Sequence, residues 1–300
     1  VNAGIMSLSQ AATIIYGANI GTTVTAQIVA LGMFGGDSIS TTVLFSALAG
    51  VGAFMALFSK KDVWKKWGGI LTGFGMLFVG LDMMSDSMEN FARLEAVKVF
   101  LAGINNVLLI VIGAIITAII QSSSVMTSIA IAMVFTGLIT LDQGIFLTMG
   151  SNIGSCVVAI LASITSGINA KRTAVMHLTF NISGVLFIGT LGMLLSLFTG
   201  GMTFGTLFEK AFPGVPQTQL AMFHTFFNVL TVVVMLPLTN QLVKLATTII
   251  KDKKSEEVDP NAPRLYFIDD NMLKTPPIAV QQTKNEICNM ADIAMRNFNL

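Results

Sequence analysis

The sequence IITAIIQSSSVMTSIAIAMV, residues 115–134, contains four consecutive polar residues inside an apolar run. The segments on either side are apolar enough for the interior of a membrane, whereas Gln121, Ser122, Ser123 and Ser124 are not. Within a bilayer, irregular backbone is tolerated only where it is buried in protein or lines a cavity. The stretch therefore predicts a polar site at membrane depth, provided that the rest of the chain also crosses a bilayer.

Composition places the whole chain in the membrane class. Of its 300 residues, 53% are hydrophobic and 11% are charged, and the mean hydropathy is +0.77. Soluble domains carry roughly 25% charged residues. The net charge of +1 indicates no polyanionic partner, and Cys156 and Cys288 lie in too different surroundings to suggest a disulfide framework. We expect an all-α polytopic membrane protein that binds no nucleic acid.

Eight apolar runs are candidate spans of the bilayer, which takes about 20 apolar residues to cross. The runs at 107–120 and 125–139 are short, and they fit either two spans or the two arms of a re-entrant hairpin with the serines at its tip. The candidate spans are Ala11–Met33, Thr41–Phe58, Gly68–Met84, Val107–Ile120, Val125–Ile139, Gly144–Thr165, Thr173–Phe198 and Leu220–Ile249.

After Lys251 the composition becomes polar. The sequence KDKKSEEVDPNAP predicts a charged linker, and the segment from Thr275 has the apolar spacing of an amphipathic helix of a soluble domain. The chain begins at Val1 without a methionine and stops within this expected helix, so we interpret it as part of a longer protein.

An internal repeat relates two parts of the chain. GIMSLSQAATIIYGANIGTTVTAQ from Gly4 aligns without gaps to GLITLDQGIFLTMGSNIGSCVVAI from Gly137, an offset of 133. The two copies share a Gly-x-Asn-Ile-Gly core. The equivalent of Gln121 in the first copy would lie 133 residues earlier, before residue 1. We therefore expect a second Gln-Ser-Ser-Ser-like element upstream of this segment.

The distribution of basic residues predicts the orientation of the spans. Lysine and arginine cluster at 60–66, 171–172 and 251–254, and these clusters belong on the cytoplasmic side. An odd number of crossings then lies between residues 105 and 171, which three spans supply. The two copies of the repeat consequently run in opposite directions. Inverted repeats with interrupted helices are a recurring design of secondary transporters.

The quartet at 121–124 offers amide and hydroxyl oxygens, with amide hydrogens, but no fixed charge. Such oxygens suit Na⁺, whereas hydroxyls and the N–H groups at a helix start suit an oxyanion. A single serine in a membrane helix usually bonds to its own helix or joins two helices. Three serines after a glutamine are better explained by a ligand site.

The paired motifs GANIGTT (17–23) and GSNIGSC (150–156) each place two glycines and an asparagine inside an apolar run. Glycine permits a broken helix, and broken helices expose carbonyl and N–H groups to ions. The alternative is a small-residue packing seam between helices. Because the same asparagine occurs in both copies, we favour the ligand-binding interpretation.

Charged and titratable residues narrow the chemistry further. Acidic residues at 82–95 lie at or beyond a span end, Asp142 is expected in a loop, and no carboxylate falls at the middle of a span. An intramembrane carboxylate usually marks a proton relay, so its absence favours Na⁺ over H⁺ as the coupling ion. The two histidines precede asparagines by four residues, in the pairs His177–Asn181 and His224–Asn228. We interpret these pairs as helix-packing or second-layer groups rather than direct substrate ligands.

The motifs Gln-Ser-Ser-Ser and Gly-Ser-Asn-Ile-Gly, the latter duplicated, resemble those of the bacterial sodium/phosphate cotransporter family of the type II class. The segment from about Asn261 is similar to the start of the PhoU-like domain that many bacterial members carry. The resemblance implies two inverted repeats, at 1–104 and 105–250, followed by a linker at 251–262 and the PhoU-like tail at 263–300. It also implies a phosphate/sodium site lined by Gln121, Ser122, Ser123, Ser124, Ser151, Asn152, Ser155, Asn19, Thr22 and Thr23. Sodium would be held through Gln121, Ser122, Thr22 and Asn152.

Sodium-coupled phosphate transport by alternating access is therefore the leading hypothesis, with Na⁺ as the coupling ion and no other cofactor. Cys156 stands where the first copy has Thr23, so the second copy has one hydroxyl fewer. The expected location is the inner membrane with a cytoplasmic tail, and a homo-oligomer is left open. A phosphate exporter and a phosphate sensor remain alternatives. An intramembrane serine hydrolase is remote, because no Gly-x-Ser-x-Gly elbow is present and no acidic residue orients either histidine.

Overall fold

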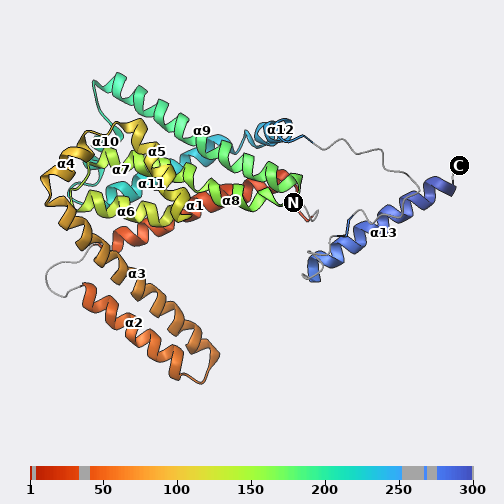
Figure 1. The fold of residues 1–300 in the computed structure, drawn as a ribbon, viewed down its shortest axis with the longest axis horizontal. Coiled ribbons are helices and arrows are strands. Elements are labelled where there is room, and N and C mark those ends of the chain that lie inside the picture. The colour runs from red at the N-terminus through yellow and green to blue at the C-terminus, as the bar shows by residue number, and fades with distance from the viewer. Residues whose placement is uncertain (2–4, 34–40, 252–266, 269–275, 299–300) are drawn as a thin grey trace. The chain divides into compact units, whose positions relative to one another are not determined.

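The computed structural model describes residues 1–300 except 2–4, 34–40, 252–266, 269–275 and 299–300. The described residues form helices and no strand (Figure 1), as expected for an all-α chain. The helices are α1 Leu8–Gly32, α2 Thr41–Phe58, α3 Asp62–Ala92, α4 Glu95–Ala102, α5 Asn106–Ile120, α6 Ser123–Phe135, α7 Leu141–Gly154, α8 Cys156–Ile164, α9 Ile168–Thr199, α10 Phe204–Ala211, α11 Pro216–Met235, α12 Thr239–Ile249 and α13 Pro276–Phe298.

Five helical segments among the described residues are long and apolar enough to cross a membrane: α1, the 62–90 part of α3, α7 with α8, α9 and α11. A sixth candidate is the pair α4 and α5, which bends by 108° at the intervening residues. Helices α2 and α6 are apolar but shorter. The prediction of a polytopic α-helical membrane protein is confirmed.

Three expectations about the elements are wrong in detail. The expected span Leu220–Ile249 is two helices, because Pro237 lacks the N–H that would continue α11. Helix α3 is longer than the expected span Gly68–Met84, because it runs from Asp62 to Ala92 and carries Asp82 and Asp86 in its last three turns. The expected loops also contain the short helices α4 and α10, and Asp142 lies in the first turn of α7 rather than in a loop.

The contacts divide the chain into two compact units, described separately. Unit 1 comprises residues 1–16, 159–180 and 235–300, and unit 2 comprises residues 17–158 and 181–234. This grouping by contact does not follow the sequence repeat, whose boundaries stay a prediction.

Within unit 2, α2 and α3 form a hairpin in which two helices lie side by side (Figure 1). Their close approach depends on small residues. A side chain at Gly52 would lie 2.5 Å from the backbone nitrogen of Thr72, and one at Gly75 would lie 2.6 Å from that of Ala49. Small residues of this kind let membrane helices pack backbone to backbone.

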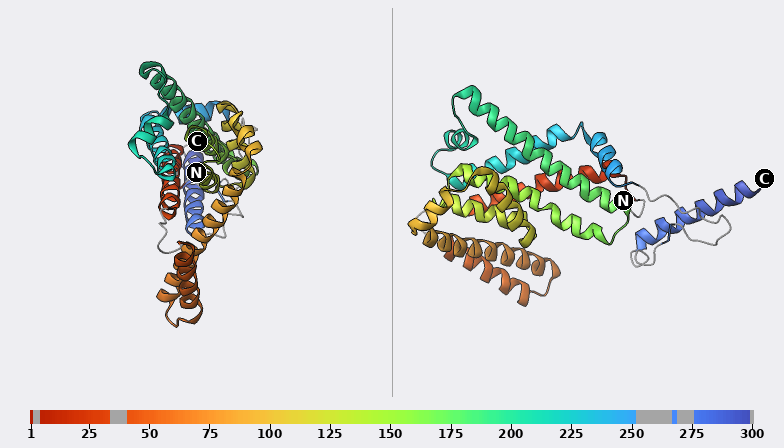
Figure 2. Two further views of the ribbon diagram at one scale, coloured as in Figure 1. Left: turned by 90° about the vertical axis from the view of Figure 1, so that its left-hand side faces the viewer. Right: turned by 45° about the horizontal axis from the view of Figure 1, so that its top comes forward.

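The core of unit 2 contains α5, α6 and α7, which pack on one another (Figure 2), together with residues of α10 and α11. Aromatic rings fill the space between α10 and α11. The Phe208 and Phe223 rings meet edge to face with centroids 5.8 Å apart, a favourable geometry for aromatic pairs. Asp142 fastens the start of α7 to that of α10, accepting hydrogen bonds from Thr203 Oγ1 (2.8 Å) and Gly205 N (3.0 Å).

Within unit 1, Arg172 links the start of α9 to the end of α12. Its Nε donates to the carbonyl oxygen of Ile250 at 2.9 Å, and the residue is 8% exposed. A cation here complements the partial negative charge at a helix C-terminus. The tail contains the amphipathic helix α13, which confirms the expected helix; its relation to a PhoU-like domain stays a prediction.

Candidate functional site

The Gln-Ser-Ser-Ser motif lies at the junction of two short helices in unit 2. Helix α5 has 15 residues and α6 has 13, which correspond to lengths of about 22 Å and about 20 Å. Neither covers a hydrocarbon core about 30 Å thick. Of the two arrangements predicted, the re-entrant hairpin therefore fits better than two full spans. A hairpin that returns to its starting side adds no crossing. In that arrangement α7 with α8 would supply the odd number that the basic clusters require, in place of the three spans expected, and the orientation stays a prediction.

The turn of this hairpin is built from Gln121 and Ser122. Gln121 has φ 60° and ψ 25°, the left-handed conformation, and its N–H donates to Thr117 O at 2.7 Å. It is the one non-glycine residue with positive φ among the residues that the structure describes. Glycine is the usual residue at this position after a helix. An exposed glutamine in its place puts a neutral amide at this turn.

Ser122 begins α6. Its Oγ accepts from Val125 N at 3.3 Å and so caps the helix. The N–H groups of the first residues of a helix have no partner within it, and the helix dipole makes this end partly positive. Ser122, Ser123 and Ser124 are partly buried around it. The motif thus combines hydroxyl groups, N–H donors and a neutral amide at one helix start.

The glycines of the second paired motif pack against α5. Side chains at these positions would meet backbone carbonyl oxygens, which is the packing seam that we had ranked second. The pairs are Gly150 with Ile110 O, Gly154 with Ala114 O and, on the other helix, Gly113 with Leu147 O. The expectation that the glycines break the helix is wrong for the first copy, where α1 runs unbroken through residues 17–23. In the second copy the interruption is confined to Ser155, whose backbone stays helical.

Asn152 of the same motif points to a different helix. Its Nδ2 donates to Asn228 Oδ1 of α11 at 2.9 Å, and both residues are nearly inaccessible. Asn228 Nδ2 in turn donates to the backbone oxygen of His224. Asn181 of α9 likewise donates to Cys156 Sγ at 3.2 Å. The asparagines of both His–Asn pairs thus contact the motif.

Two further bonds tie the motifs to each other and to their own helices. Ser151 Oγ donates to Ser123 O at 3.3 Å, so the second paired motif contacts the Gln-Ser-Ser-Ser motif directly. Ser155 Oγ donates to Asn152 O at 2.7 Å. In the first copy Thr22 Oγ1 makes the equivalent bond to Asn19 O at 2.7 Å. The two copies therefore share a local geometry.

Helix α1 approaches the motif beside a cavity of about 290 Å³ in unit 2. Ser124 and Ser128 of α6 line one side and Thr25 of α1 another, and α3 contributes apolar side chains. Asn19 and Thr23 are buried, and Thr23 Oγ1 bonds to Ile20 O, but neither residue lines this cavity. The residue of α1 that shares this cavity with Ser124 of the motif is therefore Thr25, which was not among the predicted site residues.

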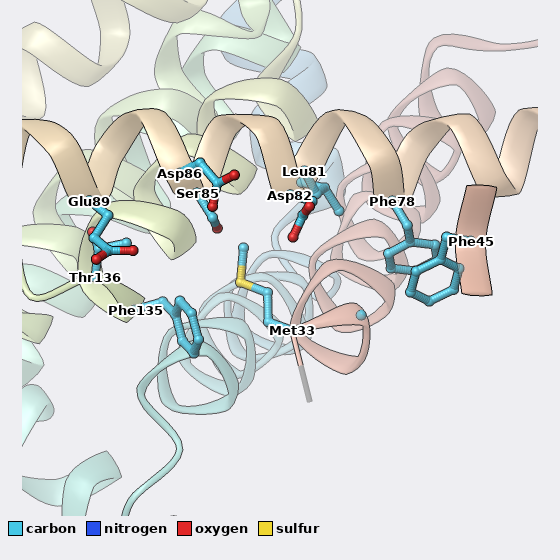
Figure 3. A pocket seen from close by; sticks show the side chains of 11 residues that line it. Met33, Phe45, Phe78, Leu81, Asp82, Ser85, Asp86, Glu89, Phe135 and Thr136 are labelled. Carbon is cyan, nitrogen blue, oxygen red and sulfur yellow. The ribbon is translucent and has the colours of Figure 1, made fainter. Parts of the chain in front are cut away.

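A second cavity of unit 2, of about 220 Å³, is acidic (Figure 3). Asp82, Asp86 and Glu89 lie along one side of it on α3, with Met33 and Phe135 among the apolar residues opposite. Their spacing of four and three residues puts all three carboxylates on one face of the helix. Among the described residues, no group of three acidic, histidine or cysteine side chains is arranged to hold a metal ion.

Sequence reasoning also missed two buried threonines. Thr127 lies one turn after Ser123, and Thr148 lies one turn before Asn152. Each is at most 2% exposed. Helical spacing from the motifs could have identified both, because residues four apart share a helix face.

Comparison with known proteins identifies the family. A model described as Na+/Pi-cotransporter matches residues 1–86 and 79–209. The chain belongs to the Na+/Pi-cotransporter family. This is a transporter family and not an enzyme family, which confirms the prediction that the chain is no enzyme. No solved structure matches the chain.

Several proteins resemble this member of the family. "Uncharacterized protein YqeW" of Bacillus subtilis is 30% identical over 255 residues, covering 84% of this chain and 77% of its own. "Putative inorganic phosphate export protein YjbB" of Escherichia coli is 25% identical over 96% of this chain, which spans half the length of YjbB. The human "Sodium-dependent phosphate transport protein 2B" is 45% identical over 89 residues, which make up 28% of this chain and 13% of that protein.

Proposed function

We propose that this chain is the membrane core of a sodium-coupled transporter of inorganic phosphate that works by alternating access. The observation that carries the proposal is the position of residues 121–124 at the tip of a hairpin, at the start of α6, in a member of the Na+/Pi-cotransporter family. The positive end of α6 and the hydroxyls of Ser122, Ser123 and Ser124 suit an oxyanion.

Charge accounts for the coupling. Helices α5, α6 and α7 contain no lysine or arginine, and transferring an unpaired dianion out of water is very costly. Sodium ions bound to neutral oxygens would offset this charge. Gln121, Ser122 and Asn152 supply such oxygens near the hairpin tip. Thr22 also remains a proposed sodium ligand through the lone pairs of its Oγ1, because the bond to Asn19 O uses the hydroxyl hydrogen and no lone pair.

The surroundings of the chain follow from the same proposal. Inorganic phosphate and sodium are the partners, and the protein would lie in the cell membrane with a cytoplasmic PhoU-like tail beginning near residue 263. The basic clusters support this orientation. A tail of this kind also suits a protein that senses phosphate, and transport measured with and without the tail separates the two roles.

Export is the second candidate for direction. It is favoured by the similarity, along 96% of this chain, to a relative whose name refers to phosphate export. The hairpin and its neutral oxygens suit either direction, because ion gradients and not the ligand groups set the direction of net flux.

The test is uptake of radiolabelled phosphate into proteoliposomes that contain the full-length parent protein. We expect uptake with an inward sodium gradient, little with potassium, and a large loss in Ser123→Ala. Ser166→Ala is the matched control, because Ser166 lies two residues after α8, is partly buried, and its hydroxyl bonds to Ala162 O in the last turn of that helix. Phosphate loaded inside the vesicles tests export in the same preparation. Equal fluxes with sodium and potassium in both directions would refute sodium coupling.

A further inference from the structure

Among the buried polar side chains of unit 2 without a hydrogen-bond partner, which include Thr117 of α5, are Thr127 of α6, Thr148 of α7 and His224 of α11. These last three are 2%, 0% and 1% exposed. The Oγ1 atoms of Thr127 and Thr148 and both ring nitrogens of His224 lack a bond. A buried polar group left without a partner destabilises the folded state. Four such atoms in one region therefore indicate that the site binds something.

Thr127 and Thr148 differ from other threonines of unit 2. Thr136, at the C-terminal cap of α6, donates to Ala132 O at 2.8 Å, and Thr231 of α11 donates to Phe227 O at 2.7 Å. This bond to the preceding turn is open to any threonine inside a helix. Thr127 and Thr148 do not make it. Neither hydroxyl is therefore hydrogen-bonded to the backbone of its own helix.

The register of α7 and α11 places Thr148 opposite His224. A side chain at Gly144 would lie 3.1 Å from Leu220, and Asn152 bonds to Asn228. Thr148 is four residues after Gly144, and His224 is four residues after Leu220. Because both helices advance by the same rise, the two residues share one level between these contacts.

Helix α6 brings Thr127 to the same level. Its two ends contact α7 at Val134, which faces Gly144, and at Ser123, whose carbonyl oxygen accepts from Ser151. Thr127 lies between these contacts, one turn from Ser123. It also shares a helix face with Val134, seven residues later. Three helices thus direct unpaired polar groups into one part of the core.

The chemistry of these groups defines the ligand. A neutral imidazole has one donor and one acceptor nitrogen, and each threonine hydroxyl both donates and accepts. Helices α6 and α7 contain one charged residue, Asp142, which is bound to the start of α10, and α11 contains none. A group that both donates and accepts, an O–H group, satisfies such a site, whereas an ion that only accepts leaves the ring lone pair unpaired.

We propose that Thr127, Thr148 and His224 form an inner hydrogen-bonding site that binds an O–H group, supplied either by a protonated oxygen of phosphate or by a water molecule. The phosphate source rests on the proposed function. The site lies one helical turn, about 5.4 Å, from the level of Ser123 and Asn152. One phosphate ion can span this separation, because two of its oxygens can each form a hydrogen bond of about 2.8 Å, one at each level. Phosphate keeps a protonated oxygen near neutral pH and sulfate has none, so the phosphate source would select against sulfate.

The test compares variants of the full-length parent protein in sodium-containing detergent solution, by thermal unfolding with inorganic phosphate or sulfate. Thr148→Val removes one hydroxyl, His224→Phe removes both ring nitrogens, and His224→Gln keeps a donor and an acceptor. Thr231→Val is the matched control, because that hydroxyl already bonds within α11. We expect Thr148→Val and His224→Phe to lower the Tm by more than the control does, and His224→Gln to restore part of the loss.

The phosphate and water sources give different results. If phosphate supplies the O–H group, Thr148→Val weakens phosphate binding on the order of tenfold, the control does not, and sulfate protects no variant. If water supplies it, the Tm falls with unchanged phosphate affinity. A lower Tm for Thr148→Val in a parent that moves no phosphate would refute the proposed function and leave a water site. Deleting unpaired buried polar atoms should stabilise the protein, so a Tm at or above wild type for both Thr148→Val and His224→Phe would overturn the inner site.

Discussion

Replacing Gly150 with alanine tests the seam between α5 and α7 on which the motif hairpin rests. The added Cβ would meet the carbonyl oxygen of Ile110 and would lie 2.7 Å from its carbonyl carbon and 2.8 Å from its Cα. All three atoms belong to the backbone, so no rotation of a side chain relieves the overlap. The two helices must separate, and α5 carries Gln121 at its end.

The expected loss of stability follows from two opposing effects. Overpacking a core costs about 1–3 kcal/mol, and a backbone obstacle places this variant in the upper part of that range. Alanine in a helix interior is favoured over glycine by about 0.5–1 kcal/mol. We therefore expect a net loss of about 2 kcal/mol. Phosphate uptake should fall as well, because separation of α5 from α7 displaces the hairpin tip.

The first motif provides a matched control. Gly17 aligns with Gly150, but a Cβ added at Gly17 meets no atom within 4 Å. Gly17→Ala in this 300-residue chain should be neutral or stabilising by up to about 1 kcal/mol. Thermal unfolding in detergent measures both variants. If Gly150→Ala is as stable as wild type, the seam does not constrain the helices. If Gly17→Ala loses as much as Gly150→Ala, the loss does not come from the backbone contact between α5 and α7.

Three further predictions concern single contacts. Gln121→Gly should raise the Tm, since relief of the left-handed backbone is worth about 1 kcal/mol, yet it should abolish sodium-dependent uptake; retained uptake would show that the amide is dispensable. Asn228→Ala leaves the Asn152 amide without its partner and should cost about 1–3 kcal/mol in thermal unfolding; an unchanged Tm would show that the amide pair contributes nothing. Asp142→Asn keeps an acceptor for Thr203 but loses the charge, so the start of α10 should be destabilised by about 1 kcal/mol, measured in the same way. If Asp142→Asn is as stable as wild type, the negative charge of Asp142 does not strengthen its hydrogen bonds to the start of α10.

Most of the membrane helices could be predicted because hydropathy is a local property. The run Thr41–Phe58 coincides with α2, and α5 begins within one residue of its expected start. The predicted helix boundaries were wrong where a proline was overlooked and where charged residues were taken to indicate a loop. Pro237 should have divided the expected 220–249 span, since it cannot donate the bond that continues a helix. Helix α4 lies in a segment whose charged residues favoured a loop, and it is an amphipathic helix with apolar residues packed on the core.

The candidate site was predictable in position but only partly in the roles of its residues. The Gln-Ser-Ser-Ser quartet is conspicuous against its apolar background, and the structure places it at a helix junction. The glycines of the paired motif were misread because their partner, α5, is some 40 residues distant along the chain, from Ile110 to Gly150. Thr127 was overlooked because an isolated threonine in a membrane helix is usually bonded to its own backbone. Only the missing bond reveals it.

The spacing Gly-x-Asn-x-Gly reconciles the packing and ligand interpretations of the second motif. Gly150 and Gly154 lie one turn apart and share the face against α5, whereas Asn152, two residues from each, lies on another face and meets Asn228. One short segment thus fixes the hairpin to α7 and places a polar group against α11 on its other side. Because the seam is backbone to backbone, α5 and α7 should move as one body during transport. The rearrangements of alternating access would then occur on the opposite side of the hairpin, where α6 faces α1 and α3 across the 290 Å³ cavity beside Ser124.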